Sequence, residues 1–193
     1  MKALPRNAHA GLFAAFAALM LATRFHHFGT ALHLPDASMA LFFLGGLYLR
    51  RHWQFAVFIV LAVAIDWIAI EHAGVSDFCV TPAYSFLLPA YAVLWYGGRL
   101  YADRLQPSWR SMTGAALVAL ACASLSFAIS NGAFYWLGGR YANPHVAEYL
   151  ARAWQWGPLF VRTTLAYVVV ALAAHALAAW ALRVRAGRGA TPA

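Results

Sequence analysis

Residues 52–72 read HWQFAVFIVLAVAIDWIAIEH, and this stretch decides the fold. A helix of about 20 apolar residues crosses the hydrocarbon core of a bilayer, and this run has that length. Arg50 and Arg51 stand directly before it, and the carboxylate of Asp66 interrupts it near its far end. The stretch therefore predicts a transmembrane helix that begins next to basic residues and carries an ionisable side chain, Asp66, near its other end.

The composition extends this prediction to the whole chain. Of its 193 residues, 63% are hydrophobic and only 10% are charged, whereas a soluble domain carries roughly 25% charged residues. The length suits about one domain, and apolar runs leave no room for a soluble catalytic domain. The net charge of +8 lies in brief clusters at the ends of these runs. That placement favours anionic lipid over nucleic acid as the partner of the basic residues.

Six apolar runs predict six membrane-spanning helices in one transmembrane domain, residues 1–193. We expect the spans at about 8–24, 37–49, 52–72, 80–98, 111–130 and 156–182. Ala and Leu dominate them without the strict alternation of an outer-membrane barrel, so the predicted class is an all-α integral membrane protein. The second run is short, and Gly45 and Gly46 mark it as tilted, broken or extended by the preceding loop.

The basic residues predict the orientation. Ten of the fourteen Lys and Arg residues lie in four segments, 2–6, 50–51, 99–110 and 183–188. These segments share one side of a six-span chain, and the excess of Lys and Arg places that side in the cytoplasm, with both termini. The opposite loops, about 25–36, 73–79 and 131–155, hold Asp36, Asp77, Glu148, Cys79 and four histidines. We therefore expect the reactive groups on the outer face of the membrane.

Small residues recur every fourth position in the first span. Ala10, Ala14, Ala18 and Ala22 form a smooth stripe that lets another helix approach closely. Two interpretations stay open, namely packing within the monomer and docking of a partner subunit. Lys2 and Arg6 before an apolar core also resemble a secretory signal, but no clear small-x-small cleavage site follows.

Asp66 and Cys79 are the main candidates for chemistry. A carboxylate within a membrane span is a functional hypothesis by default, although pairing with Arg24 or Arg152 would give Asp66 a structural role. Cys79 precedes an expected helix whose Pro82 suits the first turn. The positive potential of a helix N-terminus predicts a lowered thiol pKa and a reactive thiolate. Cys122, in the middle of a span, is expected to be inert.

A single Cys79 thiolate is suited to bind a metal ion whose other ligands come from a different molecule. No CxxC or HExxH spacing accompanies Cys79, so a zinc site is not predicted. One axial position on a metal within a macrocycle needs only a single thiolate. The outer segments also carry aromatic residues suited to the walls of such a site, although most of these suit an interfacial aromatic belt equally well.

Several of these residues together resemble a known family, the BtuM family of bacterial cobalamin transporters, which are related to the S-components of energy-coupling-factor transporters. The resemblance covers essentially the whole chain. It rests on Arg24-Phe25-His26-His27-Phe28-Gly29, Asp66, Cys79 ahead of Thr81-Pro82-Ala83-Tyr84, Ser130-Asn131-Gly132 and Arg152. The isolated Cys ahead of Thr-Pro-Ala-Tyr is the most specific of these features.

The resemblance implies a six-helix S-component-like bundle in a bacterial cytoplasmic (inner) membrane that takes up cobalamin or cobinamide. Cys79 would bind the corrin cobalt as an axial ligand and displace the nucleotide base, and electron donation by its sulfur would assist removal of an upper cyanide. The implied ligand-binding residues are His27, Asp66, Tyr84 and Arg152, with Phe78 and Tyr135 as walls. The alanine stripe would dock on an energy-coupling-factor subunit. The chain has no nucleotide-binding motif, so ATP hydrolysis would belong to other subunits.

Two other classes remain open. A haem- or quinone-binding oxidoreductase subunit would use the histidines, although these crowd the outer loops instead of facing each other in pairs. A structural or assembly protein would need no ligand at all.

Overall fold

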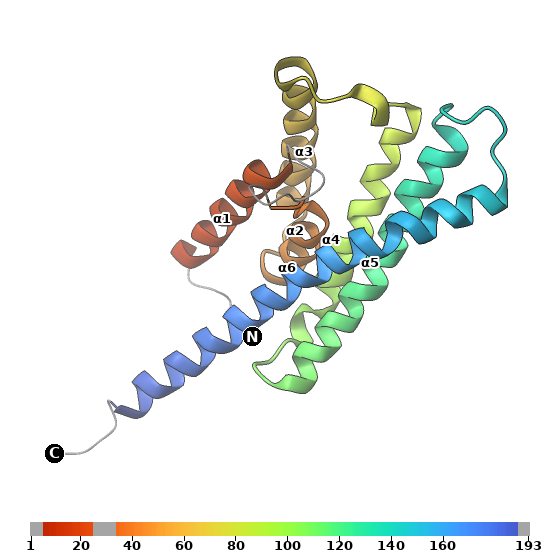
Figure 1. Ribbon diagram of the computed structural model, residues 1–193. Coiled ribbons are helices and arrows are strands. Elements are labelled where there is room, and N and C mark those ends of the chain that lie inside the picture. The colour runs from red at the N-terminus through yellow and green to blue at the C-terminus, as the bar shows by residue number, and fades with distance from the viewer. Residues whose placement is uncertain (1–5, 25–33, 189–193) are drawn as a thin grey trace.

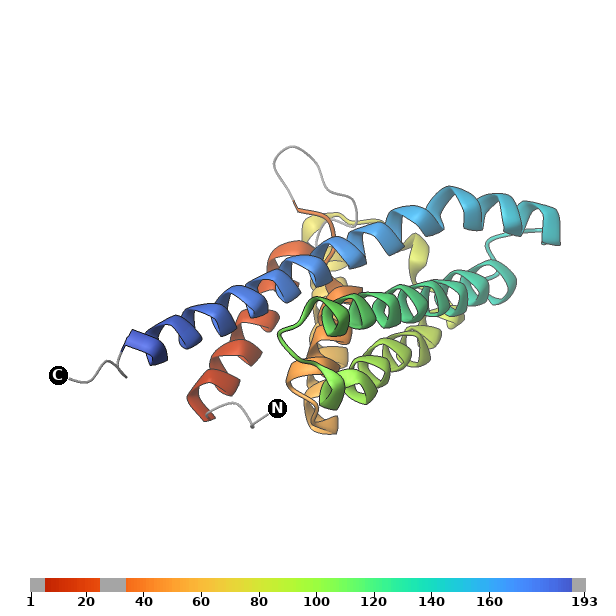
Figure 2. The same cartoon turned by 90° about the horizontal axis from the view of Figure 1, so that it is seen from below.

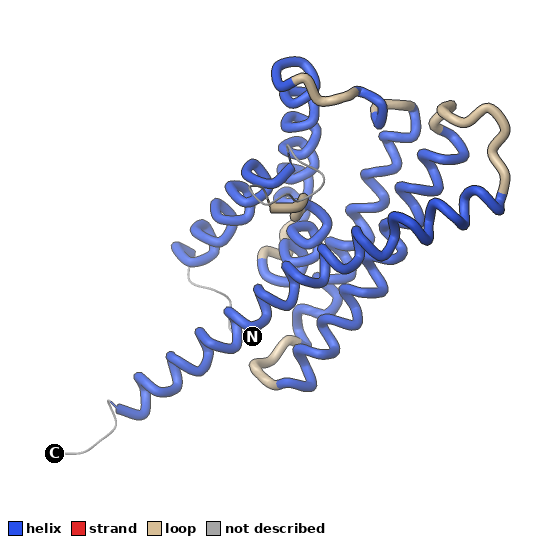
Figure 3. Tube along the Cα trace, viewed as in Figure 1, coloured by secondary structure: helices blue, strands red, loops and turns tan. Residues whose placement is uncertain are grey.

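Every regular element of the described chain is helical. The computed structural model describes residues 6–24 and 34–188 (Figure 1), and Figure 3 shows helices joined by short loops. In chain order the elements are α1 (Arg6–Arg24), α2 (Ser38–Tyr48), α3 (His52–Ala73), η1 (Asp77–Cys79), η2 (Pro82–Phe86), α4 (Leu87–Tyr101), η3 (Ala102–Arg104), α5 (Trp109–Leu137) and α6 (Val146–Arg188), where η denotes a 3₁₀ helix. The all-α class is therefore confirmed.

Three of the helices are long and apolar enough to cross a membrane. They are His52–Ala73, Trp109–Leu137 and Val146–Ala186. The α4 helix has 15 residues and α2 only 11, so α2 is about 16 Å long against a hydrocarbon core of about 30 Å. The protein thus has the features of a membrane helical bundle, while the count of six crossings stays a prediction.

The short helix α2 forms the centre of the bundle. Nine of its eleven residues are buried, and it packs mainly against α4 through glycine. A Cβ atom added at Gly46 would lie 1.8 Å from the carbonyl oxygen of Trp95, and one added at Gly98 would lie 2.1 Å from that of Phe43. The two backbones touch because neither contact position carries a side chain. Gly45 and Gly46 therefore mark a close helix contact.

The structure corrects the expected boundaries of α4, α5 and α6. We expected an outer loop at 131–155, but α5 continues to Leu137 and α6 already begins at Val146. Hydropathy marks where apolar residues end, and a helix can continue past that point until its backbone is interrupted. Gly139 has a φ of 67°, and Pro144 lacks the backbone N–H that a helix interior needs. The expected span 80–98 is likewise displaced, because the chain at Pro82 first forms η2 and α4 ends only at Tyr101.

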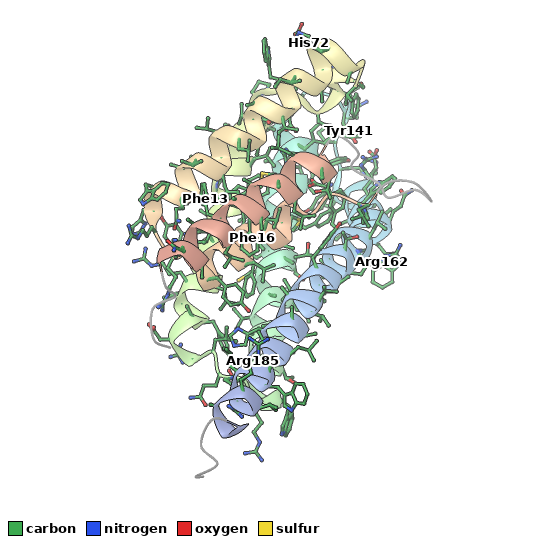
Figure 4. All side chains as sticks on the ribbon, turned by 90° about the vertical axis from the view of Figure 1, so that its left-hand side faces the viewer. Phe13, Phe16, His72, Tyr141, Arg162 and Arg185 are labelled. Atoms are coloured by element: carbon green, nitrogen blue, oxygen red, sulfur yellow. The ribbon has the colours of Figure 1, made fainter. Side chains whose placement is uncertain are left out.

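The loops that connect the helices lie at two opposite ends of the molecule. In Figure 1 the segment between α3 and α4 and the α5–α6 loop lie at the top, whereas the loop after η3 lies at the bottom. Figure 4 shows the same separation in side chains, with His72 and Tyr141 at one end and Arg185 at the other. The last turns of α6 extend away from the other helices (Figures 1 and 2). We call the end with His72 and Tyr141 the thiol end, because Cys79 lies there.

The α2–α4 contact gives a stability prediction. Gly98→Ala forces a methyl group into the backbone of Phe43, so we expect the free energy of unfolding to fall by about 1–3 kcal/mol. Gly11→Ala makes the same chemical change in α1, where an added Cβ meets nothing within 4 Å, and should be neutral or stabilising because Ala favours a helix. Thermal unfolding of the detergent-solubilised protein, followed by circular dichroism, measures both. Equal melting temperatures for the two variants would contradict the proposed contact.

Candidate functional site

The thiol end is built on a buried ion pair between α1 and α3. The Nε of Arg24 donates to Oδ1 of Asp66 at 2.8 Å, and a terminal guanidinium nitrogen donates to Oδ2 at 2.7 Å. The side chain of Arg24 is 3% exposed and that of Asp66 17%. This two-pronged geometry is the strongest form of an arginine–carboxylate contact. Of the alternatives for Asp66, the structure contains the pairing with Arg24.

The remaining donors of Arg24 reach two other helices. Its second terminal nitrogen donates to the hydroxyl oxygens of Ser38 in α2, at 2.8 Å, and Tyr91 in α4, at 2.9 Å. The carboxylate of Asp36 lies 3.7 Å from the same nitrogen and accepts a hydrogen bond from the Ser38 hydroxyl at 2.6 Å. One guanidinium therefore joins four helices, which satisfies a charge that would otherwise be costly to bury.

A small pocket opens from this ion pair toward Cys79. Tyr84 of η2 donates its hydroxyl to Oδ2 of Asp66 at 2.6 Å. The pocket, of about 30 Å³, is lined by Arg24, Asp66, Ala69, Ile70, Val75, Ser76, Cys79, Val80 and Tyr84. A cavity of this size holds a water molecule or two and no larger ligand. We call it the thiol pocket; Cys79 is exposed at its edge.

The predicted lowering of the Cys79 pKa is wrong. Although the side chain has solvent access, crowding around the sulfur raises the pKa of the Cys79 thiol, the charge of Asp66 raises it further, and Arg140 only partly offsets this. The expected helix dipole is missing, because Cys79 ends the three-residue η1 and α4 begins only at Leu87. Near neutral pH the group is therefore a thiol.

Beside the thiol pocket, aromatic rings form a row that we call the aromatic ridge. It comprises Phe78, Phe134, Tyr141, Tyr135 and Tyr149. Successive ring centroids lie 5.5 Å (Phe78–Phe134), 6.2 Å (Phe134–Tyr141), 4.6 Å (Tyr141–Tyr135) and 5.6 Å (Tyr135–Tyr149) apart. Because Phe78 precedes Cys79 in the chain, the ridge begins next to the thiol. Tyr141, labelled in Figure 4, lies at this end of the molecule.

Two arginines lie over the ridge. The guanidinium carbon of Arg140 is 5.1 Å from the centroid of the Phe78 ring, and Nε of Arg140 donates to the Phe78 carbonyl oxygen at 3.1 Å. The guanidinium carbon of Arg152 is 4.8 Å from the Tyr141 ring centroid. Cation–π contacts of this kind hold guanidinium groups against aromatic faces. The ridge therefore combines flat apolar surface with planar hydrogen-bond donors.

The structure places six of the residues predicted from the sequence in two neighbouring groups. Asp66, Tyr84 and Cys79 line the thiol pocket, while Phe78, Tyr135 and Arg152 belong to the ridge. Tyr135 is only 2% exposed, and its hydroxyl donates to Glu148 at 2.9 Å, so it supports the ridge from within. His27 lies outside the described residues.

Arg140 was not predicted from the sequence to belong to the candidate site. Arg140 lies in the predicted outer loop, outside the four basic clusters. An arginine on the predicted outer side departs from the charge pattern, and this departure could have identified Arg140 as a site residue. Arg24 and Arg152 depart from the pattern in the same way. In the structure all three contact carboxylate or aromatic groups at the thiol end.

Other polar atoms at the thiol end lack protein partners. Within the described chain, the buried hydroxyl of Thr81 and the side-chain oxygen of Asn131 accept or donate no hydrogen bond. Buried polar groups are nearly always paired, with water or a ligand where protein offers nothing. In the same ranges, no three His, Cys, Asp or Glu side chains gather closely enough to hold a metal ion by themselves.

The alanine stripe of α1 faces away from the bundle. Ala10, Ala14, Ala18 and Ala22 are all exposed, whereas Phe16 and Met20 on the same helix are buried. The interpretation that the stripe packs within the monomer is therefore wrong. The larger apolar side chains bury the other face of α1 and leave the small ones outside.

The raised pKa of Cys79 predicts slow alkylation at neutral pH. In a Cys122→Ala background, the rate of reaction with N-ethylmaleimide should rise with pH, with a midpoint above that of the unfolded chain, because only the thiolate reacts. Arg140→Gln should shift the midpoint further up and Asp66→Asn down. A midpoint below that of the unfolded chain would contradict this electrostatic description.

No protein-family model matches this chain, and a search of curated proteins finds no match either.

Proposed function

We propose that this protein is the substrate-binding membrane subunit of a corrinoid uptake system, which binds cobalamin or cobinamide on the outer face of the bacterial cytoplasmic membrane. Cys79 coordinates the cobalt through its sulfur, and the nucleotide base of the ligand is displaced. The observation that carries this proposal is the exposed Cys79 thiol at the edge of a polar pocket and at the start of the aromatic ridge.

The geometry supports a ligand that lies across the thiol end. A corrin ring cannot enter a cavity of about 30 Å³, so it would rest over the pocket with its metal at the sulfur. Phe78, 48% exposed, offers an apolar face beside it. Arg140 and Arg152 supply planar donors for the amide and phosphate groups at the edge of a corrinoid, a task for which arginine is well suited. Asp66 and Tyr84 form the polar floor.

Coordination by Cys79 requires loss of its proton. Because the pKa of the Cys79 thiol is raised, cobalt must displace that proton when sulfur binds, and ligation should become faster as the pH rises. Sulfur donates its electron pair to Co(III), the lower base leaves, and an upper cyanide bound to the same metal is weakened and departs as the cyanide anion. No change of oxidation state is needed for this exchange.

The exposed alanine stripe supports the docking of a coupling subunit. Small residues let a second helix approach closely within a membrane, and the four alanines present such a surface on α1. An energy-coupling-factor subunit would supply ATP-driven transport from outside this chain.

The haem- or quinone-binding alternative finds less support. The five described histidines contact different partners: His9 the Leu49 carbonyl, His52 Tyr96 and Arg99, His72 the Trp67 ring, His145 Glu148 and His175 the Tyr48 ring. Paired axial ligation needs two histidines facing one metal. A reduced-minus-oxidised spectrum of the purified protein would reveal a haem directly.

The proposal predicts a spectral signature that depends on Cys79. Purified protein incubated with cobalamin or cobinamide should retain the corrinoid with a shifted visible band, and Cys79→Ser should return the band toward that of the free ligand. Cys122→Ser, which also removes one thiol, should leave the shift intact. Loss of the shift in both variants, or no retained corrinoid in the native protein, would overturn the proposal.

If a coupling subunit docks on the alanine stripe, substitutions in the stripe should reduce transport without changing corrinoid binding. Ala14→Leu and Ala18→Leu should leave corrinoid binding unchanged, because both side chains are exposed, while uptake by cells should fall severalfold. Ala15→Leu changes an exposed alanine beside the stripe and serves as the matched control. Unchanged uptake in the two stripe variants would argue against this docking face.

A further inference from the structure

A second polar site lies at the end of the molecule opposite Cys79. Here the turn between α2 and α3, the first turn of α3, the end of α4 and η3 surround an open basin of about 760 Å³. We call it the basic basin; its lining residues are Arg50, His52, Tyr96, Arg99, Leu100 and Asp103. Unlike the thiol pocket, it has room for a whole ligand group.

Arg99 is held in place at one side of the basin. One terminal guanidinium nitrogen of Arg99 contacts Nε2 of His52, and Nδ1 of His52 lies 2.9 Å from the Tyr96 hydroxyl oxygen. Within the described chain, Arg99 makes its hydrogen bonds through this one nitrogen. Its other donors are therefore available to a ligand.

Arg50 forms the other side in an unusual backbone conformation. Its φ is 71°, and it is the only non-glycine residue of the described ranges with a positive φ. That conformation is unfavourable for a residue with a Cβ, and such outliers often accompany binding sites. Arg50 is paired with Asp103, but the two side chains are 38% and 83% exposed. An ion pair this exposed is weak and can be exchanged for a better anion.

The chemistry of the lining selects the ligand class. Two guanidinium groups give planar, charged donors that match the oxygens of a phosphate, and the Tyr96 hydroxyl adds a neutral polar group. Leu100, 75% exposed, places apolar surface at the same rim. A phosphate attached to an apolar chain fits this combination, and the rim lies where basic clusters are predicted to meet anionic lipid.

We propose that the basic basin binds a phosphate group through Arg99 and Arg50, with Asp103 as the internal competitor for Arg50. The group is carried either by an anionic lipid headgroup or by a soluble phosphate. This site is independent of corrinoid binding at Cys79.

Native mass spectrometry of the full chain in neutral detergent tests the proposal. The probes are phosphatidylglycerol, zwitterionic phosphatidylcholine and inorganic phosphate. We expect a phosphate-bearing anion to bind, and Arg99→Gln to weaken it roughly tenfold, as expected for a charged hydrogen bond. Arg110→Gln removes the same charge from an exposed position outside the basin and should leave binding unchanged.

A gain-of-binding variant separates this site from misfolding. Asp103→Asn frees Arg50 from its competitor and should tighten binding, an effect that damage to the fold cannot produce. Selective retention of phosphatidylglycerol identifies a lipid headgroup, whereas binding of inorganic phosphate without lipid identifies a soluble phosphate. Equal losses in Arg99→Gln and Arg110→Gln, weaker binding in Asp103→Asn, or no binding of either anion would overturn the proposal.

Discussion

The ion pair between Arg24 and Asp66 is the interaction on which the rest of the structure depends. A guanidinium with a 3% exposed side chain has lost its hydration, and only complete pairing makes this tolerable. The pairing is complete because Asp66 comes from α3, Ser38 from α2 and Tyr91 from α4. The packing of these helices is thus fixed by the geometry of one side chain at the end of α1.

The same ion pair shapes the chemistry at the thiol end. Both oxygens of Asp66 are engaged by Arg24, and Oδ2 also accepts the Tyr84 hydroxyl. Asp66 therefore acts first as a positioning group, with its charge contributing to the raised pKa of Cys79. A ligand at Cys79 would bind above a floor whose polar groups already satisfy one another, which leaves specificity to the sulfur, the aromatic ridge and its two arginines.

Sequence patterns predicted the features that depend on local composition. The run 52–72 agrees with α3, His52–Ala73, because apolar length and flanking arginines both act along one helix. The pattern also led to Asp66 and Cys79, and the family resemblance added Tyr84; these three residues line one pocket. What it missed depends on contacts between distant segments. The burial of α2 follows from glycine contacts with α4. The raised pKa of the Cys79 thiol follows first from burial of the sulfur and second from the charge of Asp66, thirteen positions earlier in the chain.

The helix boundaries predicted from hydropathy were wrong for a related reason. Hydropathy predicts where a bilayer would end, whereas α5 and α6 continue beyond that point until Gly139 and Pro144 interrupt the backbone. The aromatic ridge depends on this extension, since Phe134 and Tyr135 lie on the last turns of α5, in the expected loop. Residues 25–33, with His27, are outside the described chain, so the role expected of His27 stays a prediction.

A double-mutant cycle on Arg24 and Asp66 tests the central claim most directly. Unfolding of Arg24→Gln, Asp66→Asn and the double variant would be measured in detergent against the native protein. We expect each single change to cost about 3–5 kcal/mol, because it removes one partner of a buried ion pair, and the double variant to cost clearly less than the sum. Additive losses would show that the two side chains are not coupled and would contradict the role of this ion pair as the interaction that fixes the bundle.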